Sequence, residues 1–215
     1  MMRSKFDMQL EELNEELTRM GGLCEEAIGK AAQALREGSA EKAREMIAAD
    51  EEIDQMEKEI ERMCLKLLLQ QQPVAKDLRQ ISAALKMITD MERIGDQAAD
   101  IAEIILSADL SEGTDMEEIS EMAAGVSKMV NDSILAYVNK DLTLAKEVIQ
   151  ADDRIDAMFD SIRQKLVLLI QGGNQGETAI DLIMVTKYLE RIGDHATNIA
   201  EWVEFSITGV HIDQN

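Results

Sequence analysis

A five-residue segment that occurs twice is the feature that most limits the possible folds of this chain. Glu92–Asp96 reads ERIGD, and the same letters recur 98 residues later at Glu190–Asp194. Nine of the twelve residues from Glu92 to Glu103 match their counterparts in the second copy. Repetition over this length indicates that one structural unit is used twice.

A second repeated segment lies upstream, and its offset is different. The pattern Ala-Asp-x-x-Ile-Asp occurs at residues 49–54 and again 102 residues later at 151–156. The four-residue difference between the two offsets falls in the loop that joins the second and third predicted helices of each unit, where length varies freely. We therefore divide the chain into two units, residues 1–108 and 109–215.

Helix-forming residues dominate the composition. Hydrophobic residues make up 46% of the chain, aromatic residues only 3%, and there is one proline. Apolar residues such as Phe6, Leu10, Leu13 and Leu17 recur at three- and four-residue steps, which is the spacing of one helical face. We predict six helices, over about residues 6–36, 40–69, 74–107, 115–139, 142–171 and 176–207.

Capping and breaking residues set the ends of these helices. Ser39 and Asp141 are expected to cap the second and fifth helices, and Asp115 to open the fourth. Pro73 ends the second helix because it cannot continue the hydrogen-bond ladder, and residues 172–176, rich in glycine, separate the fifth from the sixth. Long helices joined by short loops pack as antiparallel neighbours. The predicted fold is all-α: two pseudo-symmetric antiparallel three-helix bundles.

Net charge and cysteine content narrow the class of protein. The formal charge is −21, from 43 acidic against 22 basic residues, which argues against nucleic-acid binding and against adhesion to an anionic membrane. Cys24 and Cys64 occupy apolar-stripe positions and are interpreted as reduced core thiols. The chain shows no signal peptide and no apolar run of about 20 residues, so we expect a cytoplasmic protein without direct membrane insertion.

Pairs of acidic residues four positions apart lie on the same two helices of each unit. Side chains at i and i+4 share one helical face. On the third and sixth helices this acidic face points away from the apolar stripe, whereas on the second and fifth it flanks the stripe. We therefore expect each bundle to carry an acidic groove, formed by Asp50, Asp54, Glu92 and Asp96 in one unit and by Asp152, Asp156, Glu190 and Asp194 in the other.

Two interpretations of these acids stay open. They are either solvated residues paired with neighbours such as Arg93 and Lys58, or ligands of a multivalent cation that relieves their mutual repulsion. His195 projects about 100° from Asp194 and is interpreted as a surface residue rather than a ligand. Gly95 and Gly193 lie inside predicted helices, where close helix packing explains them best. Arg93 and its counterpart Arg191 are expected to neutralise nearby acids.

The two ERIGD segments, the paired acid-xxx-Asp motifs and the opening Phe6-Asp7-x-x-Leu10 resemble the PhoU family of bacterial phosphate-signalling accessory proteins, over nearly the whole chain. The resemblance implies two three-helix bundles with surface metal clusters of iron, zinc, manganese or magnesium. One site would use Asp50, Asp54, Glu92, Asp96 and Asp100, and the other Asp152, Asp156, Glu190, Asp194 and Asn198. Asn198 stands where the first unit has Asp100, which removes one charge, and Phe159 and Arg163 stand where it has Glu57 and Glu61.

The resemblance also implies a regulatory role. Such a protein is a negative regulator of phosphate-starvation genes that couples a phosphate-specific ABC transporter, through its cytoplasmic subunit, to a phosphate-sensing histidine kinase, and it is expected to form a homodimer. We predict no enzymatic activity. A metal-free helical scaffold or adaptor is the alternative. A carboxylate-bridged di-iron oxidase is disfavoured because the sequence contains no Glu-x-x-His motif and the acids face outward.

Overall fold

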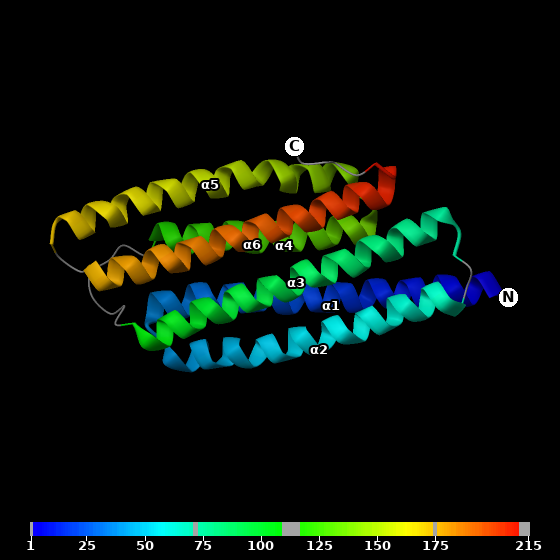
Figure 1. The fold of residues 1–215 in the computed structure, drawn as a ribbon, viewed down its shortest axis with the longest axis horizontal. Helices are drawn as coiled ribbons and strands as arrows, with labels where there is room; N and C mark the ends of the chain where they lie inside the picture. Colours follow the sequence, from blue (N-terminus) through cyan, green and yellow to red (C-terminus); the bar gives the residue numbers. More distant parts are fainter. Residues whose placement is uncertain (1, 71–72, 109–116, 174–175, 211–215) are drawn as a thin grey trace.

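The chain folds into six long helices in the computed structural model (Figure 1), which describes residues 2–70, 73–108, 117–173 and 176–210. No strand occurs within these residues. The helices closely follow the apolar periodicity of the sequence, so the all-α prediction is confirmed. Their bounds are α1 Met2–Glu37, α2 Ala40–Gln70, α3 Ala75–Ser107, α4 Glu117–Asn139, α5 Leu142–Gln171 and α6 Gly176–Thr208.

Most predicted helix ends are confirmed. The Ser39 hydroxyl accepts a hydrogen bond from the Lys42 amide at 3.4 Å, and the Asp141 carboxylate accepts from the two amides that open α5, at 2.9 and 3.0 Å. The start of α1 was predicted wrongly: the helix begins at Met2 instead of Phe6, because its first turn lacks the apolar spacing that marks a buried face. Asp115, and part of the loop at 172–176, lie outside the described residues.

Each unit is a three-helix bundle, and the two bundles share a single core. In the first bundle α1, α2 and α3 all touch one another, and in the second α4, α5 and α6 do the same. The bundles meet through α3 against α6 and α1 against α4, so α3 and α6 run side by side through the middle of the molecule (Figure 1). Buried apolar side chains from all six helices form one continuous cluster. The repeat in the sequence is therefore a repeat of helices around a common interior.

Both cysteines lie in this interior. Cys24 and Cys64 are buried free thiols, as predicted. The Cys24 thiol donates to the backbone oxygen of Met91 at 3.4 Å, which ties α1 to α3. Burial raises the pKa of each thiol to about 12, so both are held in the neutral form. Across the described helices, none combines the length and apolar character that crossing a membrane requires.

Candidate metal centres between paired helices

The contact between α2 and α3 brings the first set of predicted ligands together. We call Asp50 and Asp54 of α2, with Glu92, Asp96 and Asp100 of α3, the first acidic cluster. Asp50 is close enough to Asp96, Asp54 and Asp100 for each to raise its carboxyl pKa, and Glu92 feels both Asp96 and Asp54 in the same way. Because the acids come from both helices, their mutual approach depends on how closely α2 and α3 pack.

Gly95 makes that close approach possible. A Cβ atom at this position would lie 2.7 Å from Oδ1 of Asp50 and 3.1 Å from Cδ1 of Ile53, both on α2. Close packing, the interpretation given to this glycine from the sequence, is therefore confirmed. Its consequence is that Asp50 Oδ1 is pressed against the α3 backbone, where it is buried and has no hydrogen-bond partner. A buried carboxylate oxygen without a partner is rare in a folded protein.

Burial and neighbouring charges shift the pKa values of the first acidic cluster upward. The pKa of Asp50 rises to about 6, through burial first and the charges of Asp96, Asp54 and Asp100 next. Burial, followed by Asp96, raises the pKa of Glu92, and burial with Glu103 raises that of Asp100. All three shifts have the same sign because each carboxylate loses water and gains negative neighbours.

The second bundle repeats this arrangement between α5 and α6. We call Asp152 and Asp156 of α5, with Glu190 and Asp194 of α6, the second acidic cluster. Asp152 Oδ1 is buried without a partner, as in the first bundle, and lies 3.5 Å from the Cβ that an alanine at Gly193 would carry. Burial, then Asp194 and Asp156, raises the pKa of Asp152 to about 6. One oxygen of each of these two equivalent carboxylates thus lacks a partner, although the Asp152 carboxyl also forms a hydrogen bond with Thr197 that lowers its pKa.

Basic neighbours neutralise part of each cluster. Arg93 pairs with Asp96 at 2.9 Å and with Glu92 at 3.3 Å, as predicted, and Lys58 lies 3.7 Å from Asp54. In the second bundle Lys187 pairs with Glu190. Among the described residues, no three carboxylate, imidazole or thiol groups converge as they would around one metal ion. The side chains therefore share a face in each bundle without closing on a common point.

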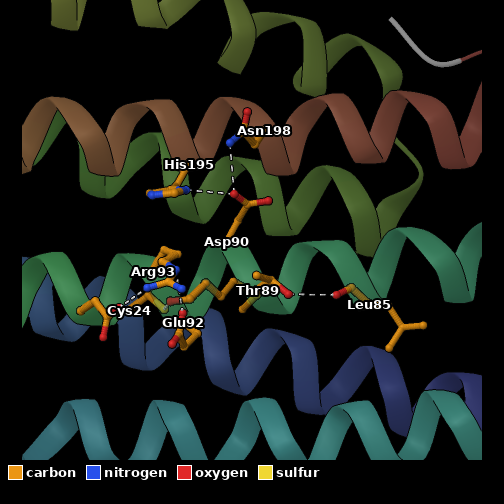
Figure 2. Close-up of polar contacts among 10 residues, drawn as sticks. Cys24, Leu85, Thr89, Asp90, Glu92, Arg93, His195 and Asn198 are labelled. Atoms are coloured by element: carbon orange, nitrogen blue, oxygen red, sulfur yellow. Dashed lines mark hydrogen bonds and ion pairs between the residues drawn. The ribbon is translucent and has the colours of Figure 1, made fainter. Parts of the chain in front are cut away.

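Asn198 lies away from the second cluster, at the contact between the two bundles. Its amide nitrogen donates to Oδ1 of Asp90 on α3 at 3.1 Å (Figure 2). The same oxygen lies 2.9 Å from Nδ1 of His195. The interpretation of His195 as a surface residue was therefore wrong, because its partly buried ring joins α6 to α3. The helical angle placed His195 correctly off the cluster, but it could not show that another bundle covers that face.

Asp100 of α3, the position equivalent to Asn198, contacts α6 in the same way as Asn198 of α6 contacts α3. It forms a hydrogen bond with Tyr188 of α6, and Arg191 lies near enough to lower its pKa. Tyr188 and Asp90 are equivalent positions of the repeat, 98 residues apart, as are Asp100 and Asn198. Sequence reasoning missed Asp90 and Tyr188 because it compared identical residues. The offset of 98 residues relates Asp90 to Tyr188 as equivalent positions, but it does not show that each of them contacts the other bundle.

The chemistry of the clusters suits cations. All their donor atoms are carboxylate oxygens, the preferred ligands of hard divalent and trivalent ions. One buried oxygen in each cluster lacks a partner, so the donor atoms suit a cation in their chemistry, while the described side chains do not converge on a single point. The clusters contain no histidine or thiol, and we find in them no nucleophile with an adjacent base.

Fold and site together define a tandem-repeat helical-bundle protein with one acidic cluster per repeat. The PhoU domain model matches residues 17–105 and 119–203, one segment in each bundle. The chain is 39% identical to the phosphate-specific transport system accessory protein PhoU homolog of Clostridium acetobutylicum, over the full length of both chains. With the homologue of the same name from Aquifex aeolicus it shares 38% identity, over 87% of this chain and 86% of that one. The chain belongs to the PhoU family.

Solved structures support the same conclusion. PhoU from Pseudomonas aeruginosa superposes with a TM-score of 0.89 at 33% identity, covering 95% of this chain and all of that one. The phosphate transport system regulatory protein PhoU from Streptococcus pneumoniae superposes with a TM-score of 0.91 at 27% identity, covering 97% of this chain and all of that one. The paired three-helix bundles are thus the fold of the family.

Proposed function

We propose that this protein is a cytoplasmic, non-enzymatic regulator of phosphate uptake that represses phosphate-starvation genes when phosphate is ample. Its relatives are named phosphate-specific transport system accessory proteins, and one structural neighbour is named a phosphate transport system regulatory protein. Its partners would be the cytoplasmic subunit of a phosphate-specific ABC transporter and a phosphate-sensing histidine kinase, and it would act as a homodimer. The acidic surface suits docking on basic partner surfaces.

Metal binding at the two acidic clusters is the second part of the proposal. The observation that carries it is the pair of buried, partnerless oxygens of Asp50 and Asp152, at equivalent positions of the repeat. A bound cation would neutralise the repulsion within each cluster and join the two helices that supply the ligands. Iron, manganese, magnesium and zinc are the candidate ions. The proposed ligands are Asp50, Asp54, Glu92, Asp96 and Asp100 in one bundle and Asp152, Asp156, Glu190, Asp194 and Asn198 in the other.

Hydrogen bonding ranks these ligands. Asn198 and Asp100 both turn toward the opposite bundle, where they contact Asp90 and Tyr188. The acid-xxx-Asp pairs nearer the cluster centres have no such contacts outside their bundle. We therefore expect substitutions at the pairs to weaken metal binding more than substitutions at Asp100 or Asn198.

Calorimetry on chelator-treated protein tests the metal half of the proposal. Titration with Mn²⁺ or Fe²⁺ is expected to show saturable binding by the wild type. Binding should be lost from the first bundle in Asp54→Ala plus Asp96→Ala and from the second in Asp152→Asn. Asp153→Asn is the matched control, because Asp153 is exposed on the same helix as Asp152. Absence of binding by the wild type would leave the metal-free adaptor as the better description.

A deletion strain tests the regulatory half. Without the gene, phosphate-starvation promoters should be active in phosphate-rich medium, and the wild-type gene should restore repression. Complementation by the metal-binding variants then shows whether the ions matter for repression or only for folding. Normal repression in the deletion strain would contradict the proposed role, whatever calorimetry shows.

A further inference from the structure

The start of α3 and the ends of α4 and α6 lie at the same end of the molecule (Figure 1). Residues of these three helix ends line a small cavity. Its volume is about 200 Å³, and it sits at the junction of the two bundles, because α3 belongs to the first and the other two helices to the second. Six residues line it: Lys76, Gln80, Tyr137, Lys140, Ser206 and Ile207. It is far along the helices from either acidic cluster.

The cavity is basic in a strongly acidic protein. Two lysines line it, and no acidic residue does within the described part of the chain. Neither Lys76 nor Lys140 takes part in any of the ion pairs found among the described residues. The adjacent acids are engaged elsewhere, since Asp77 accepts from the Val74 amide and Asp141 caps α5. Both ammonium groups are therefore available to a ligand.

Gln80 supplies a buried polar side chain at this cavity. It is only 8% exposed and lines the cavity, and its side-chain amide forms a hydrogen bond with the Tyr137 hydroxyl, which leaves one of the two amide N–H groups for a ligand. Next to it on α3, the guanidinium of Arg79 lies against Gly209, and its Nε is buried without a partner. A buried amide with one N–H left, lining a cavity beside two lysines, can donate to a bound anion.

The hydroxyl groups of the cavity act as acceptors. The Tyr137 hydroxyl already donates to the backbone oxygen of Gln80 at 3.0 Å, and the Ser206 hydroxyl donates to that of Val203 at 2.7 Å. Each hydroxyl has one hydrogen, so only its oxygen lone pairs remain for a ligand. An anion bound here must therefore offer a donor as well as negative charge. Inorganic phosphate keeps a proton at neutral pH and meets this requirement, whereas sulfate carries none.

The equivalent place at the other end of the molecule has lost these features. Lys140 adopts a left-handed backbone conformation with φ of 54°, where the first unit has Gly38 with φ of 60°. Glycine accepts that conformation without strain, but lysine does not. At the positions that match Arg79, Gln80, Tyr137 and Ser206 the repeat has Glu177, Thr178, Leu35 and Ala108. The basic cavity is thus a property of one end only, and a strained lysine is kept there.

We propose that this cavity is a binding site for inorganic phosphate. Lys76 and Lys140 supply the charge, the Gln80 amide donates, and the Tyr137 and Ser206 oxygens accept the phosphate proton. Lysine is a common point-charge partner of phosphate. The volume falls below the roughly 300 Å³ at which pockets for larger organic ligands begin, so a nucleotide would not fit inside. Repulsion from the distant acidic clusters is screened over about 10 Å at ordinary ionic strength.

Calorimetric titration of the full, metal-free chain with inorganic phosphate in chloride buffer tests this site. Saturable binding of one phosphate per chain is expected. Lys76→Gln and Lys140→Gly should each weaken it at least tenfold, and the second variant should stay folded because glycine suits that backbone. Arg44→Gln, an exposed charge-matched control at the opposite end, should bind like the wild type. Ser206→Ala should reduce the preference for phosphate over sulfate.

Three results would overturn the proposal. One is the absence of saturation at millimolar phosphate by folded wild-type protein. Another is equal affinity for sulfate, which would remove the role of the two hydroxyl acceptors. The third is equal weakening by Arg44→Gln and Lys140→Gly, which would show a response to overall charge instead of a site. Metal binding at the acidic clusters is independent of all three.

Discussion

At the scale of single residues, Asp50 and Asp152 show how a charged group can be held where the fold does not stabilise it. Each packs one oxygen against a glycine of the neighbouring helix and receives no hydrogen bond at that oxygen. Burying a charged carboxylate oxygen without a hydrogen bond lowers the stability of the metal-free protein. That cost ends when a proton or a cation binds, so stability should report on both.

The first prediction concerns pH. The pKa of Asp50 is raised from 3.8 to about 6, mainly by burial, and that of Asp152 likewise. Between these values the folded chain binds more protons than the unfolded chain, so metal-free stability should fall as pH rises from 4 to above 6. A two-unit shift corresponds to at most about 3 kcal/mol, and solvent contact reduces this to about 1 kcal/mol per cluster.

Urea unfolding of metal-free protein between pH 5 and 7.5 measures this effect. Asp50→Asn plus Asp152→Asn should flatten the pH dependence, and Asp153→Asn, on the surface of the same helix, should leave it unchanged. Metal-free stability that rises through this range in the wild type would contradict the upward shifts, because it would require carboxylates that the fold stabilises in their charged form.

At the scale of elements, the two glycines in the repeated segment allow α3 and α6 to approach their partner helices, but not equally. A Cβ on Gly95 would meet Asp50 Oδ1 at 2.7 Å and two carbon atoms of Ile53 at 3.1 and 3.2 Å. A Cβ on Gly193 would meet nothing closer than Ile155 Cγ2 at 3.3 Å. The α2–α3 pair is therefore the tighter of the two.

The second prediction follows from this asymmetry. In a helix interior, alanine contributes about 1 kcal/mol more to stability than glycine does. In Gly95→Ala that gain should be outweighed by displacement of Asp50 and Ile53, with a net loss of about 1–2 kcal/mol. In Gly193→Ala the two effects should nearly cancel. Urea unfolding of the two variants, which serve as controls for each other, measures the difference. Equal stabilisation of the two variants would contradict this prediction, because it would show that α2 can shift away from α3 without loss of stability.

Sequence alone predicted the elements well because their signals are local. Ser39 and Asp141 cap their helices as expected, and the ERIGD repeat correctly showed two equivalent bundles. The acid-xxx-Asp pairs of each bundle share a face because a helix fixes the angle between its residues, whereas Asp100 and Asn198 turn toward the opposite bundle. The early start of α1 and the place of His195 could not be derived in this way. The start of α1 lies in residues without a clear apolar spacing. The place of His195 depends on which helix of the other bundle packs against it.

At the scale of the whole molecule, the contact between α3 and α6 unites the two repeats. Its polar residues are related by the repeat: Asp90 accepts from Asn198 in one direction, and Asp100 bonds to Tyr188 in the other. Beside these contacts, α1 packs on α4. Gly21 of α1 is so close to Ile134 of α4 that a Cβ atom at Gly21 would lie 2.8 Å from Cγ1 of Ile134. A repeat in the sequence cannot show the α3–α6 and α1–α4 contacts, because each half carries the same pattern whether the two halves touch or not.

The third prediction is that the two bundles unfold together. Buried apolar side chains run without a break through both, so neither bundle can lose its partner without exposing part of its own core. The chain supplies a probe for each half, since Trp202 is the only tryptophan and lies in the second bundle, and both cysteines are buried in the first. Tryptophan fluorescence and thiol reactivity should therefore give the same urea midpoint.

Asp90→Ala sharpens this test. It leaves the Asn198 amide and the His195 ring without their shared partner, and should cost about 1–2 kcal/mol. Because Asp90 lies between the bundles, both midpoints should fall by the same amount. Asp160→Ala, at an exposed pair with Arg163 within α5, is the control and should shift neither midpoint measurably. Separate midpoints in the wild type, or a loss confined to one probe in Asp90→Ala, would mean that the bundles are independent domains and that the α3–α6 contact is secondary to their folding.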